Sequence, residues 1–273
     1  MPTPPRLTDR HALTLHRARA RDDAALFLHE TARDDAKDRL QMVNRSFTDV
    51  AIVTPFPRIW QPAFPTARCI PDDEVLAVEE GSCDLVIHGL CLHWADDPVG
   101  QMIQCRRALR PDGLCLVLTL GGQTLHQLRA ALRQAESELT GGLSPRVAPM
   151  GEIRDLGALL QRAGFALPVA DSDPLTASYA TPLHLMRELR AMGESNALAA
   201  RLRRPTRRAV LLRAAELYTQ AFGSVDGRVP ATFEIITLTG WAPDDSQPKP
   251  LRPGSAAQRL SDALGTAETP LND

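Results

Sequence analysis

The residue types best able to do chemistry gather between residues 72 and 94 of this 273-residue chain. Thiols and imidazoles gather at Cys83, His88, Cys91 and His93, and both groups are preferred zinc ligands. Their spacing matches no common zinc pattern, and the alternation of side chains along a strand sends some of them to opposite faces. No metal site is therefore predicted.

His93 and Trp94 follow a short apolar run that is typical of a strand. An imidazole at a strand end could transfer a proton, and an indole could flank a ligand. The structural alternative is a Trp94 packed on the following helix, with His93 making a structural hydrogen bond. The sequence leaves both interpretations open.

Three consecutive acids, Asp72, Asp73 and Glu74, precede the same apolar run. A carboxylate at this place could accept a hydrogen bond from the amino group of an adenine, and the alternative is a solvated turn. No Gly-x-Ser-x-Gly elbow, Walker loop or His-Glu-x-x-His motif occurs, so acyl hydrolysis, phosphoryl transfer and zinc proteolysis have no support.

A strand, a helix and a second strand must position these residues. Residues 84–87 and 114–120 are continuous apolar runs, which favours strands covered on both faces. A helical pattern covers residues 97–109, and Pro111 and Gly113 close it, because proline cannot continue a helix and glycine tolerates the positive φ of a turn. Such a unit predicts a parallel sheet with a right-handed crossover.

Ligands of parallel sheets bind beyond the carboxyl ends of the strands. Those ends are expected at residues 89–94 and 121–124. In the second segment Gly121 and Gly122 could leave free amides for an anion, or could simply let strand and helix meet closely. Thr124 has capping-box spacing and is the expected N-cap of the next helix.

The rest of the chain has a coarser pattern. Residues 7–40 favour a helical N-terminal extension, and prolines between residues 54 and 65 are expected to block helix formation. The predicted domains are residues 1–46 (helical extension), 47–242 (α/β domain) and 243–273 (extended or disordered tail). The remaining expected strands are 47–53, 67–70, 165–170 and 232–241, and the remaining expected helices are 124–139, 152–163, 182–192 and 205–222.

Composition narrows the class of protein. The net charge is −2, and 29 of the 31 basic residues are arginines, but acids are interspersed and no aromatic residues alternate with the basic ones. A GC-rich coding bias is the better explanation, and no nucleic-acid binding is predicted. Since no apolar run approaches the roughly 20 residues of a membrane span, and no apolar signal core begins the chain, we expect no transmembrane segment and a cytoplasmic location.

Several short motifs carry a family resemblance. The segments 84–87, 92–94 and 109–113 resemble class I S-adenosylmethionine-dependent methyltransferases. Later segments are similar to the methyltransferase-like assembly factors of respiratory complex I and their bacterial relatives. These segments are 121–125, 141–145, 155–157, 162–165, 192–196, 229–233, 240–241 and 245–247.

The resemblance implies a Rossmann-like sheet of seven strands with the last one antiparallel and helices on both faces. It implies S-adenosylmethionine as the ligand and a protein side chain as the target, with a complex I subunit as the expected partner. A mitochondrial member of that family is described as an arginine hydroxylase, and a more distant relative methylates a malonyl thioester. By the resemblance, Asp72 or Asp73 faces the adenine.

The same resemblance suggests further site residues. His88 and Leu92 are expected to line the cofactor cleft. His93, Tyr179 and Glu194 are the candidates near the substrate, with His93 the one that already stands out from its position.

The chain departs from the family in its first half. No glycine precedes Gly81, and residues 50–57 read Val-Ala-Ile-Val-Thr-Pro-Phe-Pro where the family has an acid and several glycines. A lost carboxylate on the ribose would weaken cofactor binding by roughly 100-fold to 10,000-fold. Two hypotheses follow: a family enzyme with a reduced cofactor site that acts on or assembles a protein partner, and a non-catalytic binding or assembly protein.

Overall fold

The computed structural model describes residues 6–248 and 260–266, and the chain divides into two compact units, residues 1–243 and 244–273. The second unit contains a short helix, α9 (Leu260–Leu264), in the stretch expected to be extended or disordered. The parts of that tail at 249–259 and 267–273 lie outside the described residues. The predicted boundary near residue 46 stays a prediction.

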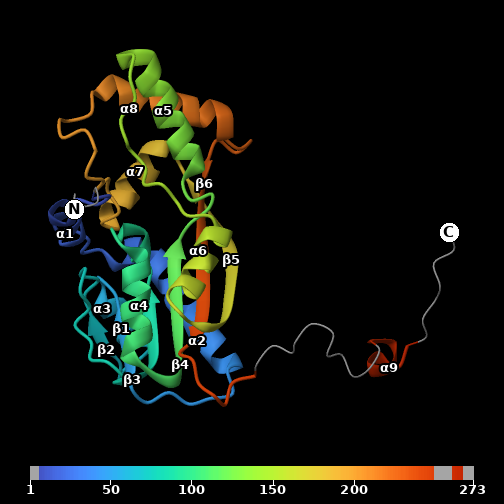
Figure 1. The fold of residues 1–273 in the computed structure, drawn as a ribbon. Coiled ribbons are helices and arrows are strands. Elements are labelled where there is room, and N and C mark those ends of the chain that lie inside the picture. Colours follow the sequence, from blue (N-terminus) through green and yellow to red (C-terminus); the bar gives the residue numbers. More distant parts are fainter. Residues whose placement is uncertain (1–5, 249–259, 267–273) are drawn as a thin grey trace. The chain divides into compact units, whose positions relative to one another are not determined.

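The first unit is built on a mixed six-stranded sheet with the order β2-β1-β3-β4-β6-β5 (Figure 1). Neighbouring strands from β2 to β4 run parallel, and β6 is antiparallel to both β4 and β5. The strands are β1 (Val50–Val53), β2 (Arg68–Ile70), β3 (Cys83–Gly89), β4 (Leu109–Leu120), β5 (Ala166–Tyr179) and β6 (Val229–Trp241). This arrangement confirms the Rossmann-like α/β class.

The described residues form one strand fewer than the seven implied by the resemblance. Only β2 lies between β1 and β3 in the sequence, because the connector after β1 is too short for a further strand and its helix. The shortened first half therefore removes one edge strand from the sheet.

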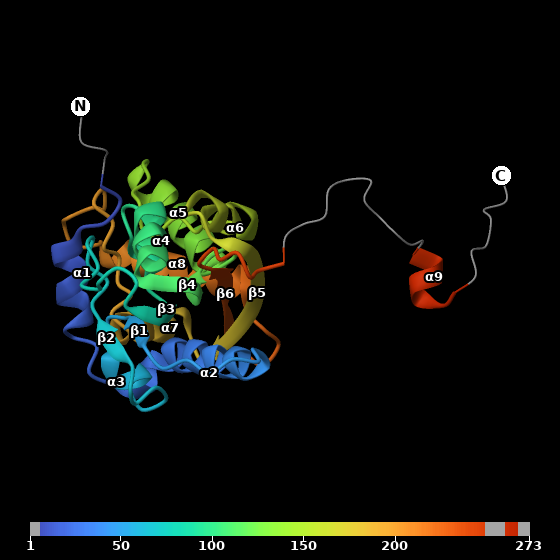
Figure 2. The ribbon, with the colours of Figure 1, turned by 60° about the horizontal axis from the view of Figure 1, so that its bottom comes forward.

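Helices cover both faces of the sheet, as Figure 2 shows, with α2 on one face and α4 and α6 on the other. In the first unit the helices are α1 (Arg10–Arg17), α2 (Phe27–Met42), α3 (Pro57–Trp60), α4 (Pro98–Ala108), α5 (His126–Thr140), α6 (Ile153–Arg162), α7 (Pro182–Ala191) and α8 (Arg208–Phe222). Two 3₁₀ turns cover Asp23–Leu26 and Leu92–Trp94.

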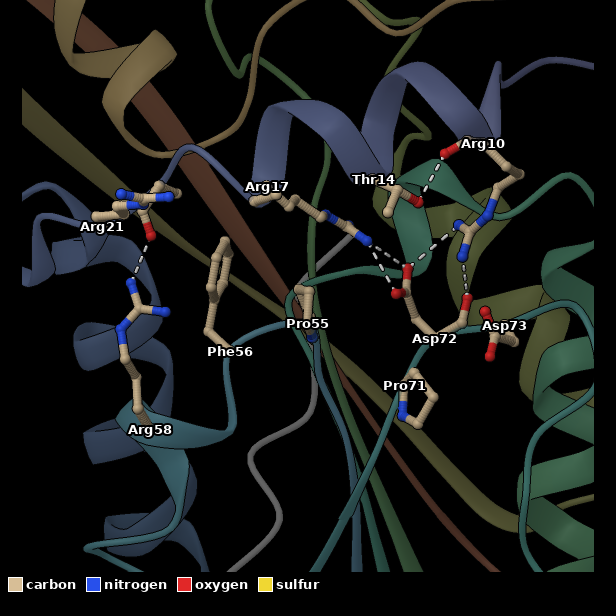
Figure 3. A pocket seen from close by; sticks show the side chains of 12 residues that line it. Arg10, Thr14, Arg17, Arg21, Pro55, Phe56, Arg58, Pro71, Asp72 and Asp73 are labelled. Carbon is tan, nitrogen blue, oxygen red and sulfur yellow. Dashed lines mark hydrogen bonds and ion pairs between the residues drawn. The ribbon is translucent and has the colours of Figure 1, made fainter.

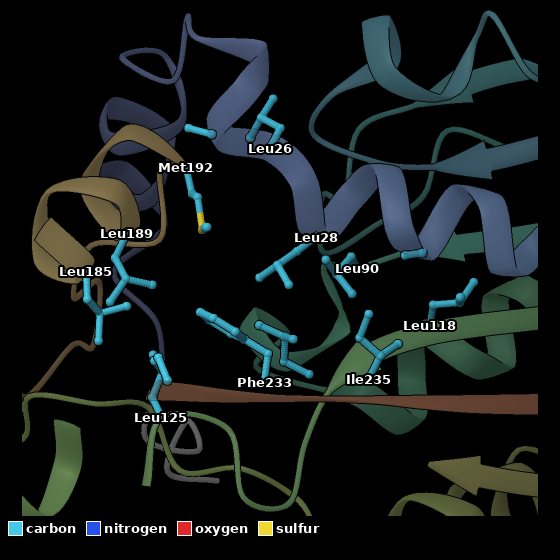
Figure 4. Close-up of a cluster of buried hydrophobic side chains, with 14 of the residues drawn as sticks. Leu26, Leu28, Leu90, Leu118, Leu125, Leu185, Leu189, Met192, Phe233 and Ile235 are labelled. Carbon is cyan, nitrogen blue, oxygen red and sulfur yellow. The ribbon is translucent and has the colours of Figure 1, made fainter. Parts of the chain in front are cut away.

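Strand alternation divides the core between these faces. Leu85 and Ile87 pack in the cluster that includes α2, whereas Val86 packs with α4 and α6. Figure 4 shows the first cluster, where Leu28 of α2 lies over Phe233 of β6. The predicted strand, helix and strand at residues 84–120 are confirmed as β3, α4 and β4.

Three local expectations were wrong. The left-handed residue is Asp112, with φ +60°, near the start of β4, rather than Gly113 in a turn before the strand. The proline-rich connector does contain a helical turn, α3, because Pro57 stands in its first turn, where a backbone donor is not needed. Leu125 rather than Thr124 caps α5, since the Thr124 hydroxyl donates to the Gly121 carbonyl oxygen at 2.7 Å instead.

The helical turn α3 follows β1 and covers that end of the sheet. Trp60 is fully buried, and its indole nitrogen donates to His29 Nδ1 of α2 at 3.4 Å. Burial lowers the pKa of His29 to about 3, so this imidazole is a neutral acceptor at neutral pH. Among the described residues no helix has the length and apolar character needed to cross a membrane.

The contact between Trp60 and the end of β3 generates a stability prediction. A Cβ added at Gly89 would lie 2.6 Å from Trp60 Cζ2, so Gly89→Ala should lower the free energy of unfolding by about 1–3 kcal/mol. Gly142→Ala is the matched control, because a Cβ there meets nothing within 4 Å. Urea unfolding measures both variants, and equal midpoints would contradict this packing.

Candidate functional site

Two cavities open at the carboxyl edge of the sheet. The first, here called the arginine pocket, has a volume of about 620 Å³ and lies beyond the ends of β1 and β2 under α1 (Figure 3). It is lined by Arg10, Thr14, Arg17, Ala18, Ala20, Arg21, Pro55, Phe56, Arg58, Pro71, Asp72 and Asp73. This edge is where the sequence predicted the ligand-binding face.

A buried ion pair crosses the arginine pocket. Arg17 Nη1 lies 2.8 Å from both carboxylate oxygens of Asp72, and Arg10 Nη1 lies 3.3 Å from one of them. The Asp72 side chain is only 8% exposed and that of Arg17 only 9%. Burial alone raises the pKa of Asp72, but the charge and hydrogen bonds of Arg17, helped by Arg10, outweigh it and lower that pKa.

Asp73 is placed differently from its neighbour. It is exposed, and its carbonyl oxygen accepts a hydrogen bond from Gln101 Nε2 at 2.6 Å. Both acids predicted at the adenine end line the arginine pocket. The carboxylate of Asp72, however, already has two guanidinium partners.

His88 and Leu92, expected to line the cofactor cleft, are instead in the core and are not among the residues lining the two cavities. His88 is fully buried, and its Nε2 lies 3.0 Å from Gln101 Oε1 of α4. Leu92 is 3% exposed and packs in the cluster below α4. Strand alternation turns His88 toward α4, which supplies the polar partner that allows its burial.

The second cavity, here called the apolar pocket, has a volume of about 340 Å³ and lies at the end of β4. Its walls are mostly leucine, methionine and phenylalanine side chains, with a few polar groups. It is lined by Leu28, His93, Trp94, Leu120, Leu125, Leu128, Leu132, Arg146, Val147, Ala148, Met150, Met186, Leu189, Glu194, Ser195, Asn196, Thr206, Leu211 and Phe233. Such a composition is typical of a binding site.

Two of the three predicted substrate-side residues meet at the apolar pocket. Glu194 Oε2 accepts a hydrogen bond from Trp94 Nε1 at 2.7 Å and lies 3.3 Å from His93 Nε2. Burial raises the pKa of Glu194, but His93, Arg17 and Trp94 together lower it to about 2. Trp94 and His93 therefore both contact Glu194, which is a structural role, and both line the cavity.

The other ring nitrogen of His93 is unpartnered. His93 Nδ1 is buried and has no hydrogen-bond partner in the part of the chain that the structure describes. With Nε2 held by the Glu194 carboxylate, Nδ1 is the atom that can exchange a hydrogen bond or a proton with a bound group. This geometry matches a carboxylate that orients a base.

Tyr179 does not join this site. It ends β5, packs in the buried cluster on the α2 face, and is not among the lining residues of either cavity. Burial, together with the carboxylate of Glu188, raises the pKa of its hydroxyl. The strand expected at 165–170 is extended in the structure to β5, which ends at Tyr179.

Sequence reasoning missed the role of α1. Arg10 and Arg17 are seven residues apart, a spacing that places both on one face of a helix, and both reach Asp72. The sequence predicts that the two arginines share a helix face, but only the location of α1 over the strand ends shows that they reach Asp72. The second missed group is Arg146, which donates to Glu136 and to the Thr206 hydroxyl beside the apolar pocket.

Comparison with known proteins now identifies relatives. A profile described as a methyltransferase domain matches residues 58–117. The protein named arginine-hydroxylase NDUFAF5, mitochondrial, is 41% identical over 200 residues in Danio rerio, with 72% of this chain and 61% of that protein covered. In Homo sapiens the identity is 40% over 195 residues, covering 70% of this chain and 55% of the relative.

A second group of relatives bears a different name. Malonyl-[acyl-carrier protein] O-methyltransferase of Gallionella capsiferriformans is 30% identical over 205 residues, covering 74% of this chain and 67% of that protein. A solved structure titled as a putative methyltransferase from Bacillus halodurans matches with a TM-score of 0.47 and 14% identity, over 76% of this chain and 98% of the other. The chain spans little more than half the length of the arginine-hydroxylase relatives.

These names correct one expectation. The arginine-hydroxylase relatives are named as mitochondrial proteins, so the predicted cytoplasmic location was wrong. That prediction rested on the lack of an apolar signal core, which is not the feature that directs proteins to mitochondria, whose targeting segments are amphipathic and rich in arginine.

The buried Glu194 carboxylate predicts a pH dependence. Its pKa is lowered in the fold from 4.5 to about 2, so its stabilising contribution is present above pH 4.5 and is lost as the pH falls toward 2. The stability difference between wild type and Glu194→Gln should therefore narrow by about 2 kcal/mol between pH 6 and pH 3. Urea unfolding at several pH values measures this difference.

Glu80→Gln, at an exposed carboxylate, is the control for the chemical change and should stay within about 0.5 kcal/mol of wild type at pH 6. A Glu194→Gln difference that is constant or widens toward pH 3 would show that the carboxylate is not held ionised by its neighbours.

Proposed function

Since this chain belongs to the methyltransferase family, we propose that it binds and assembles a protein partner through the apolar pocket, without seating S-adenosylmethionine in the family's manner. The partner proposed is a subunit or assembly intermediate of respiratory complex I, by resemblance to the arginine-hydroxylase relatives. The observation that carries this proposal is the Arg17–Asp72 ion pair across the cofactor edge of the sheet.

The chemistry of the arginine pocket disfavours the cofactor. S-adenosylmethionine carries a sulfonium and an ammonium cation beside one carboxylate, whereas four guanidinium groups and two carboxylates line this pocket, so the cofactor and the pocket lining both carry a net positive charge and repel each other. The Asp72 carboxylate already accepts three hydrogen bonds from Arg17 and Arg10, which leaves it little capacity to accept another from an adenine. Pro55 and Phe56 stand where the family has glycines that admit the cofactor's backbone contacts.

The apolar pocket supports the partner-binding half of the proposal. It combines leucine and phenylalanine walls with a few fixed polar groups, the composition that buries one inserted side chain while fixing its orientation. Glu194 supplies a buried negative charge, and Asn196 is held by a hydrogen bond from its amide to the Pro145 carbonyl oxygen at 2.8 Å. None of these groups requires a cofactor to be in place.

A second candidate is chemistry on the bound partner. The observation that favours it is the unpartnered Nδ1 of His93 beside the pocket. The imidazole lines the pocket, and the Glu194 carboxylate fixes the orientation of its ring through Nε2.

The cofactor part of the proposal is tested by isothermal titration calorimetry with S-adenosylmethionine. The wild-type protein should give no saturable heat up to millimolar ligand, because the pocket is cationic and Asp72 is occupied. Micromolar binding that disappears in Asp72→Ala would contradict the proposal and restore the family's cofactor role.

The partner part is tested by affinity capture from cells that assemble complex I. Leu211→Glu places a carboxylate in the wall of the apolar pocket and should reduce recovery of complex I subunits at least about fivefold, since a desolvated charge opposes insertion of an apolar or anionic group. Leu212→Glu is the matched control, because this neighbour on α8 is 43% exposed and should leave recovery unchanged.

A capture with no complex I subunits, or equal recovery from both variants, would contradict this function. Melting temperatures of the two variants show whether Leu211→Glu remains folded. Mass spectrometry of the captured partner separates the two candidates: a modification present with wild type and absent with His93→Gln supports chemistry, and identical partner masses support binding alone.

A further inference from the structure

A third cavity, here called the basic cleft, has a volume of about 480 Å³. Five of its lining residues are arginines, and no aspartate or glutamate is among the described residues that line it. Its lining is His16, Arg19, Ser144, Pro145, Arg146, Arg190, Ser195, Asn196, Arg201, Leu202, Arg204, Pro205 and Thr206. This concentration of positive charge contrasts with the chain's net charge of −2.

Two of the five arginines are neutralised by partners behind the cleft. Arg146 pairs with Glu136 at 2.6 Å, and Arg201 pairs with Asp9 at 2.9 Å. The other three are Arg19, Arg190 and Arg204, which are exposed and make no ion pair with any other residue that the structure describes. The cleft therefore presents three uncompensated positive charges to solvent.

The basic cleft adjoins the apolar pocket. Arg146, Ser195, Asn196 and Thr206 line both cavities. The shared wall is fixed by hydrogen bonds, since Arg146 Nη1 donates to Thr206 Oγ1 at 2.8 Å and the Ser195 carbonyl oxygen lies 3.2 Å from His16 Nδ1. A ligand lying in the cleft thus has direct access to the pocket that holds Glu194.

We propose that the basic cleft binds an acidic segment of a protein partner, and that a side chain next to that segment enters the apolar pocket. This inference rests on the proposed function and specifies which partner surface is recognised. The three free arginines come from three separate segments: the residues after α1, the end of α7, and the loop before α8. Such spacing suits an extended chain with several carboxylates better than one small anion.

Single-stranded nucleic acid is a poorer fit. Proteins that bind it combine basic grooves with aromatic side chains on which bases stack. None of the described lining residues of the basic cleft is a phenylalanine, tyrosine or tryptophan. Arginine recognises carboxylates through paired hydrogen bonds, which makes acidic residues the matching ligand class.

Fluorescence anisotropy with the full chain tests the proposal. The probe is a short fluorescein-labelled peptide of alternating glutamate and glycine that ends in leucine, and a lysine analogue is the charge control. The glutamate peptide should bind, the lysine peptide should not, and affinity should fall as sodium chloride rises from about 50 to about 300 mM because exposed charges are screened. The reverse preference would overturn the proposal.

The triple variant Arg19→Gln, Arg190→Gln, Arg204→Gln should bind the glutamate peptide at least about tenfold more weakly. The matched control also removes three exposed arginines: Arg107→Gln, Arg154→Gln and Arg162→Gln, on α4 and α6 and outside the cleft lining. Its affinity should equal that of wild type. Equal weakening in the two triple variants would show a nonspecific charge effect and overturn the proposal.

Competition distinguishes the other ligands. Full displacement of the peptide by millimolar inorganic phosphate would assign the cleft to small anions, and tighter binding of a single-stranded oligonucleotide would assign it to nucleic acid; either result overturns the proposal. If the peptide result fails while Leu211→Glu still abolishes partner capture, only this inference falls. If wild type captures no complex I subunit, the proposed function falls whatever the peptide does.

Discussion

The fold of the cofactor edge depends on one desolvated ion pair, between Arg17 of α1 and Asp72 after β2. Both side chains are more than nine-tenths buried, so removing Asp72 would leave the Arg17 charge without its partner, at a cost of about 3–5 kcal/mol. By contrast, the exposed pair of Arg58 and Asp23 contributes at most about 1 kcal/mol. The buried pair therefore fixes α1 over the strand ends.

Other contacts align α1 once this pair is made. Asp9 caps the helix through the Ala12 amide and also pairs with Arg201, and the Thr8 hydroxyl donates to the Trp94 carbonyl oxygen at 2.9 Å. The N-terminal extension is consequently part of both cavity walls rather than an appendage. The positive charge of Arg17 also favours the ionised form of Glu194 in the neighbouring apolar pocket.

How far the sequence predicted this structure depends on whether a residue's partner is local. The unit β3–α4–β4 was predictable because apolar runs, Pro111 and the helical period are all local signals. The His93–Glu194 contact joins residues 101 positions apart, so periodicity could not bring them together, and only the family resemblance suggested both. The burial of His88 could not be predicted from local pattern, because it depends on Gln101, a partner supplied by another element.

The carboxyl edge of the sheet remains occupied although residues 50–57 contain no glycine. Parallel strands bring chain ends together at that edge whatever follows them, and the space must be filled by a ligand, by water or by protein. Here a helix that precedes the sheet brings two guanidinium groups to Asp72, the acid expected at the adenine end of a bound cofactor. The apolar pocket is lined instead by residues of α2, β4, α5, α7, α8 and β6 and of the loops between them. The arginine pocket is built from α1 and from the segments that follow β1 and β2, so the two cavities depend mostly on different elements.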